Sequence, residues 1–102
     1  MNRRVIPILP LYIAEHAAEP PRLSGPAARV ERIHAALQAA VTQALGLAPP
    51  GWLRELRLGA DEVFVAVAPD LGRDGMKTAQ IAFETLRRLL PDTDIYVGAE
   101  AS

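Results

Sequence analysis

Cysteine is absent from the 102-residue chain, and only two histidines, His16 and His34, are present. The lack of cysteine excludes a disulfide framework, a zinc–thiolate site and a cysteine-ligated iron–sulfur cluster. Two histidines give little support for any other metal site, so we expect no metal and no other cofactor. The one arrangement that could bind a divalent ion combines His16 with Glu15 and Glu19 on a single loop.

Neither sign of charge dominates, because 11 basic and 12 acidic residues give a net charge of −1. This balance supplies no strong field toward nucleic acid or an anionic membrane. The apolar stretch from Val5 to Ile13 is interrupted by Pro7 and Pro10 and is too short to span a membrane. We therefore expect no nucleic acid and no membrane as partners, and a cytoplasmic location.

Phosphate-binding loops, glycine-rich dinucleotide turns and nucleophile elbows are also missing. The chain length matches one domain, which buries enough surface to fold without a disulfide or a metal. Whether the protein is an enzyme stays open at this point.

Hydrophobic periodicity predicts four strands and two helices. The strands are expected at residues 8–14, 52–58, 62–68 and 93–97, and the helices at residues 27–45 and 76–90. Ser24 and Pro26 are typical of a helix start, and Asp74 can cap the second helix. Residues 15–25 are expected to form a loop.

This order predicts an α/β fold, a single two-layer β-α-β-β-α-β domain over residues 1–102. Its four-stranded sheet carries both helices on one face. Each helix is long enough to join parallel strands through a right-handed crossover. The other face of the sheet has no cover, which favours a homo-oligomer or another partner. The apolar residues expected on that open face are Tyr12, Leu53, Phe64, Ala66 and Tyr96.

Three short stretches resemble one known family. They are Pro10-Leu-Tyr-Ile-Ala-Glu-His, then Ala40-Val-Thr-Gln-Ala-Leu-Gly-Leu-Ala-Pro-Pro, then Phe64-Val-Ala-Val with the turn Leu71-Gly-Arg-Asp and Lys77 beyond it. Together with the similarity of the two halves, they resemble the tautomerase superfamily, especially its hydroxymuconate isomerase-like members. The resemblance implies an isomerase of small 2-oxo or enol carboxylic acids, or a degenerate relative that only binds. It also implies a homo-oligomer, with a trimer or hexamer preferred.

The same resemblance implies roles for three residues. An amino-terminal proline, here Pro10, would be the catalytic base, because a secondary amine in an apolar pocket has a lowered pKa. Arg57 and Arg73 would bind the substrate carboxylate. Nine residues precede Pro10, so its nitrogen is an amide without basicity unless the chain is trimmed. Apart from the resemblance, Arg57 is typical of a solvated strand and Arg73 of an exposed loop.

An alternative is a non-catalytic interaction or regulatory domain of ferredoxin-like fold that uses its open sheet face. Residues 54–100 resemble the cytoplasmic domain of cation-diffusion transporters in their strand-strand-helix-strand order and in the closing Pro91-Asp-Thr-Asp-Ile-Tyr-Val. They also resemble small iron–sulfur assembly domains, although the cysteine of those domains would fall near Pro69 and is missing. These likenesses reflect a shared fold more than a shared function.

Overall fold

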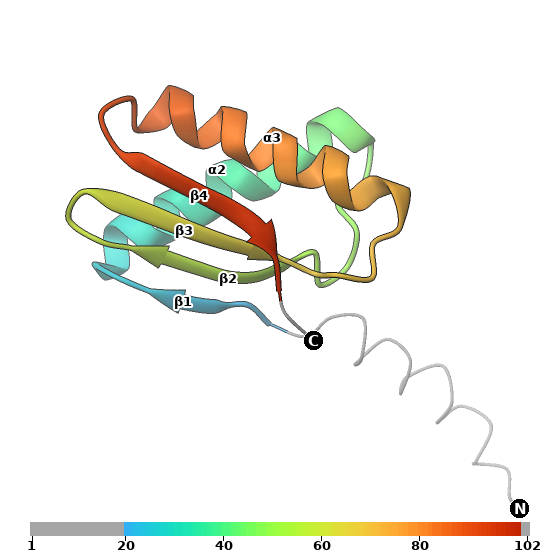
Figure 1. The fold of residues 1–102 in the computed structure, drawn as a ribbon, viewed down its shortest axis with the longest axis horizontal. Helices are drawn as coiled ribbons and strands as arrows, with labels where there is room; N and C mark the ends of the chain where they lie inside the picture. Colours follow the sequence, from blue (N-terminus) through green and yellow to red (C-terminus); the bar gives the residue numbers. More distant parts are fainter. Residues whose placement is uncertain (1–19, 101–102) are drawn as a thin grey trace, which may run out of the picture.

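The computed structural model describes residues 20–100 and confirms the two-layer α/β fold, with both helices on one face of the sheet (Figure 1). The predicted strand at residues 8–14 lies outside the described residues. The elements are β1 Arg22–Ser24, α2 Ala27–Leu45, β2 Leu53–Leu58, β3 Glu62–Val67, α3 Arg73–Leu89 and β4 Asp94–Ala99.

The four strands lie in the order β1-β2-β3-β4. β1 pairs parallel to β2 and β3 parallel to β4, as expected for strands joined through a helix, and β2 pairs antiparallel to β3. Each helix therefore joins two strands that are neighbours. In the split β-α-β units of ferredoxin-like domains another strand lies between the two that a helix joins. The strand order of residues 20–100 thus differs from that of a ferredoxin-like domain, the fold named above for the alternative interaction domain.

The two crossovers differ in hand. β1 and β2 run opposite to β3 and β4, yet the sheet order is continuous and both helices cover the same face. In both units the helix lies on the same face and the second strand lies further along the sheet in the same direction. Because only the strand direction differs between the units, their crossovers have opposite hands. In Figure 1, which looks onto the uncovered face, β3-α3-β4 is right-handed and β1-α2-β2 is left-handed. The expected right hand is wrong for the first unit, whose three-residue β1 offers little strand twist to direct the crossover.

The core lies between the sheet and the two helices. α2 contributes a stripe at helical spacing that runs from Val30 to Val41, and β3 contributes Val63, Val65 and Val67. Leu37, Leu56 and Leu86 are fully buried at the centre, one from each of α2, β2 and α3. The predicted bounds of the first helix, 27–45, agree with the structure, in which Pro26 and Gly46 flank α2.

A β-bulge changes which side chains of β2 face the core. The register between β2 and β3 shifts between Leu53 and Glu55, and Leu53 then lies opposite Val67 on the helix-covered face. Leu53 is only 3% exposed, so its predicted place on the open face is wrong. The preceding Trp52 is buried as well, at 2% exposed.

The ends of several elements differ from the sequence predictions. β1 lies inside the segment expected as a loop, because three residues there pair with Glu55–Arg57. α3 begins at Arg73 and not at residue 76, and neither helix is capped by a side chain: Pro26 and Gly72 occupy the N-cap positions. Among residues 20–100 no helix is both long enough and apolar enough to cross a membrane.

Candidate binding site on the open sheet face

The strand register places Arg57, Phe64 and Tyr96 in one row across the uncovered face. Arg57 on β2 is paired with Phe64 on β3, and Phe64 is paired with Tyr96 on β4. Side chains at directly paired positions lie on the same face and about 5 Å apart at Cβ. The row therefore combines one guanidinium with two aromatic rings.

Arg57 is held from two sides. Its guanidinium carbon lies 4.8 Å from the centre of the Phe64 ring, within the range of a cation–π contact. One of its terminal nitrogens donates to Glu55 Oε2 at 3.3 Å. A guanidinium has five N–H donors, so these contacts leave donors for a ligand, and the side chain is 58% exposed. Arg57 is thus an oriented cation open to solvent.

A small hollow, the aromatic hollow, lies beside this arginine. Its cavity volume is about 170 Å³, and it is lined by Arg57, Gly59, Glu62, Phe64 and Tyr96. Drug-sized ligands occupy cavities of roughly 300–1,000 Å³, so only a much smaller molecule fits. The ring faces offer an apolar wall, Arg57 offers donors to an anion, and Glu62 offers an acceptor. Sequence reasoning found Arg57 but not this set, because the set depends on pairing between three strands.

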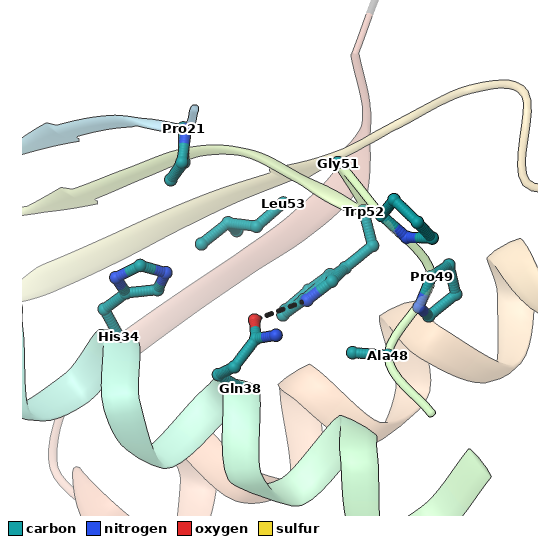
Figure 2. A pocket seen from close by; sticks show the side chains of 9 residues that line it. Pro21, His34, Gln38, Ala48, Pro49, Gly51, Trp52 and Leu53 are labelled. Carbon is teal, nitrogen blue, oxygen red and sulfur yellow. Dashed lines mark hydrogen bonds between the residues drawn. The ribbon is translucent and has the colours of Figure 1, made fainter. Parts of the chain in front are cut away.

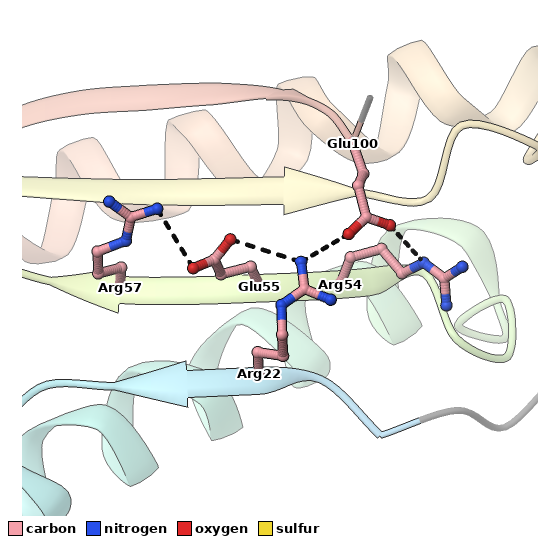
Figure 3. Close-up of polar contacts among 5 residues, drawn as sticks. All are labelled: Arg22, Arg54, Glu55, Arg57 and Glu100. Atoms are coloured by element: carbon pink, nitrogen blue, oxygen red, sulfur yellow. Dashed lines mark hydrogen bonds and ion pairs between the residues drawn. The ribbon is translucent and has the colours of Figure 1, made fainter. Parts of the chain in front are cut away.

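Ion pairs extend from Arg57 across the sheet as an ionic lattice of Arg22, Arg54, Glu55, Arg57 and Glu100 (Figure 3). Arg22 contacts Glu100 at 2.6 Å and Glu55 at 3.5 Å. Arg54 Nε lies 3.1 Å from Glu100 Oε1. The bulge at Arg54 and the end of β4 bring these groups together. The lattice therefore ties the strand at one edge of the sheet to the segment that follows the strand at the other edge.

The ionic lattice also explains the burial of Ala66. Ala66 lies on the uncovered face, opposite Glu55 on one side and Gly98 on the other. It is nevertheless only 4% exposed. The long arginine and glutamate side chains cover it, and its small size leaves them room. The open face is thus less apolar than expected: of the predicted apolar residues that are described, only Tyr96, at 52%, is largely exposed.

A hydrogen bond from Arg22 lowers the pKa of Glu100, and the charges of Arg22 and Arg54 act in the same direction. Because the folded-state pKa is depressed, this stabilisation is present above the ordinary value of 4.5 and is lost as the pH falls through the folded-state pKa. We expect Glu100→Gln to be slightly less stable than the native chain at pH 7, with the difference vanishing in acid. Urea unfolding at several pH values measures it, and a difference that does not vary with pH would contradict the assignment.

The other residues predicted for the site lie elsewhere. Pro10 falls outside the described residues. Arg73 is the first residue of α3, on the helix-covered side and at the end of the sheet away from the β2–β3 turn, whereas Arg57 lies near that turn on the open face. One chain therefore does not bring Arg57 and Arg73 together. The possible ion site at Glu15, His16 and Glu19 is also outside, and residues 20–100 hold no group of three side chains suited to a metal.

A second hollow lies between α2 and the start of β2 (Figure 2). It has a volume of about 110 Å³ and is lined mainly by apolar residues and prolines, with His34, Gln38 and Trp52 among them. The indole Nε1 of Trp52 donates to Gln38 Oε1 at 2.9 Å. Unlike the aromatic hollow, this hollow is lined by no arginine, so it offers a carboxylate no guanidinium.

No family model, curated protein or solved structure matches the chain. The resemblance to the tautomerase superfamily therefore stays a prediction, and the functional argument depends on the geometry of the aromatic hollow and the ionic lattice.

Proposed function

We propose that the protein binds a small carboxylic acid in the aromatic hollow, with Arg57 as the carboxylate-binding residue. The observation that carries this proposal is the position of the Arg57 guanidinium, 4.8 Å from the Phe64 ring centre and bonded to Glu55. Arginine is suited to carboxylates because its planar donors can bind both oxygens at once. A guanidinium already oriented by a ring and a glutamate loses less conformational entropy when a ligand binds.

The other walls narrow the ligand class. Glu62 is an acceptor when ionised, so it suits a ligand that carries an O–H donor beside its carboxylate. Phe64 and Tyr96 suit a planar, unsaturated body. The enol form of a small 2-oxo acid has all three features. The proposal includes both a tautomerase-like isomerase and a relative that binds without turnover, and the difference between them depends on Pro10.

We expect Arg57→Ala to weaken the binding of pyruvate at least tenfold. A hydrogen bond to a charged group contributes about 1.5–3 kcal/mol, and about 1.4 kcal/mol corresponds to a factor of ten. Titrations followed by NMR chemical shifts at low salt measure the affinity. Arg57→Lys keeps the charge without the planar donors, so its affinity for pyruvate should lie between those of the native chain and Arg57→Ala.

Arg87→Ala is the matched control. Arg87 also lies over an aromatic ring, Phe83 at 5.9 Å, but it belongs to α3 and does not line the aromatic hollow. Its replacement should leave pyruvate binding unchanged. Equal binding by the native chain and Arg57→Ala, or no binding by the native chain, would overturn the proposal.

The alternative, an interaction domain that uses the open sheet face, is favoured by two observations. No helix among the described residues covers this face, and its ionic lattice carries three arginines against two glutamates. A partner seated there would have to replace ion pairs with its own charges, so its binding would weaken with salt.

A further inference from the structure

We propose that the free edge of β4 pairs antiparallel with β4 of a second copy, centred on Val97, so that two chains share one continuous sheet. This inference does not depend on carboxylate binding. Among the described residues β4 is an outer strand of the sheet. It runs from Asp94 to Ala99 and pairs with β3 without any shift of register.

The hydrogen bonds of β4 to the rest of the fold identify the groups that point outward. Asp94 N donates to Asp61 O, and Glu100 N donates to Val67 O. Backbone groups alternate in direction along a strand. The N–H and C=O groups of Ile95, Val97 and Ala99 therefore point away from β3, toward the free edge.

This edge lacks the features that protect edge strands from pairing. Natural sheets shorten such strands or give them prolines, lysines, inward charges or bulges. β1, at the opposite edge, has only three residues and carries Arg22. Residues 95–99, Ile-Tyr-Val-Gly-Ala, contain no charge and no proline. The two edges of the sheet in residues 20–100 therefore differ, and of these two β4 presents the regular surface for another strand.

Pairing centred on Val97 fits Tyr96 and Gly98, two residues of β4 on the open side of the sheet. It places Tyr96 of each chain opposite Gly98 of the other, in a closely spaced pair without hydrogen bonds. Gly98 has open space above it, because a Cβ built there meets nothing within 4 Å. Tyr96 is 52% exposed. An aromatic ring that covers a glycine on the neighbouring strand is a known stabilising arrangement in sheets.

The exposed Tyr96 and the open space at Gly98 complement each other twice in this register, which favours a second copy over an unrelated strand. The same register places Asp94 of each chain opposite Glu100 of the other, at the border of the ionic lattice. The lattice has a net charge of +1 from three arginines and two glutamates, and Glu100 is already bonded to Arg22. Asp94 therefore meets a like charge in Glu100, and the repulsion is reduced because Glu100 is already paired with Arg22 and Arg54. A two-fold axis normal to the sheet relates the two chains, the commonest symmetry of homo-oligomers.

The absence of cysteine makes the register testable by disulfide formation in the full chain. In the proposed dimer the two Val97 Cα atoms are about 5.5 Å apart, which a disulfide can bridge. We expect Val97→Cys to form a covalent dimer under mild oxidation. Ala99→Cys, which is more exposed, should form no covalent dimer, because residue 99 faces Ile95 of the partner and not its own copy.

Light scattering gives an independent readout. The native chain should show twice the chain mass of 11.0 kDa. Val97→Pro removes an outward N–H without breaking a bond to β3 and should halve that mass. A native chain that is monomeric, trimeric or hexameric would overturn the proposal, as would cross-linking of Ala99→Cys in preference to Val97→Cys. Pyruvate binding by monomeric Val97→Pro would show that carboxylate binding does not require the dimer.

Discussion

Gly25→Ala is expected to destabilise the fold by about 3 kcal/mol, combining backbone strain and overpacking of roughly 1–3 kcal/mol each. Gly25 lies between β1 and α2 with a φ of 127°, a conformation that other residues rarely adopt. A Cβ there would lie 2.9 Å from Leu58 Cβ and 3.0 Å from the Leu58 carbonyl oxygen. Because one of these atoms belongs to the backbone of β2, the clash cannot be relieved by a side-chain rotation.

Gly46→Ala separates the two causes. Gly46 follows α2 with a φ of 85°, but a Cβ there meets nothing within 4 Å. Its replacement should therefore cost only the backbone strain, about 1–2 kcal/mol. Urea unfolding of both variants gives the difference, which measures the close approach of Gly25 to β2. Equal losses in the two variants would contradict the predicted contact with Leu58.

A chain trimmed to begin at Pro10 is expected to gain enolisation of pyruvate by about 100-fold or more over the chain that retains Met1 through Leu9, since general-base catalysis contributes roughly that much. In the longer chain the Pro10 nitrogen is an amide and accepts no proton. In the trimmed chain it is a secondary amine, which can take a proton from the carbon next to the keto group while the electron pair moves to the carbonyl oxygen. Exchange of the pyruvate methyl hydrogens for deuterium, followed by NMR, measures this step.

Two variants of the trimmed chain test the mechanism. Pro10→Ala replaces the secondary amine with a primary one and should lower the exchange rate, and Arg57→Ala should lower it through weaker carboxylate binding. Neither substitution should change the exchange rate of the untrimmed chain, although Arg57→Ala still weakens its binding of pyruvate. Strong exchange in the untrimmed chain that survives Pro10→Ala would show that a different base acts. If neither form exchanges but both bind pyruvate, the protein is a binder without turnover.

The sequence predicted those parts of the fold that depend on local patterns. The apolar stripe of α2 begins after Pro26 and ends before Gly46, so its length could be read directly. Leu53 was misplaced because alternation assumes a regular strand, and the bulge beside it breaks the period. The right hand predicted for the first crossover came from a general rule, and the unit that begins with the three-residue β1 is an exception to it.

The candidate site was predictable only in part, for a similar reason. Arg57 was singled out through the resemblance to the tautomerase superfamily, since its own position on a strand indicated only a solvated residue. Its neighbours Phe64 and Tyr96 become part of one hollow only through the pairing of three strands. The contact between Arg22 and Glu100 joins residues 78 positions apart, and no local pattern in the sequence indicates it.

The length of chain between Arg22 and Glu100 also has a kinetic consequence. Closing so long a loop costs entropy that nearby contacts have to offset first, so contacts of this kind form late in folding. The ionic lattice should therefore be absent from the folding transition state. Changes in Arg22 or Glu100 would then leave the refolding rate almost unaltered and appear as faster unfolding. The ionic lattice therefore forms after the sheet during folding, and its strength affects mainly the rate at which the folded chain unfolds.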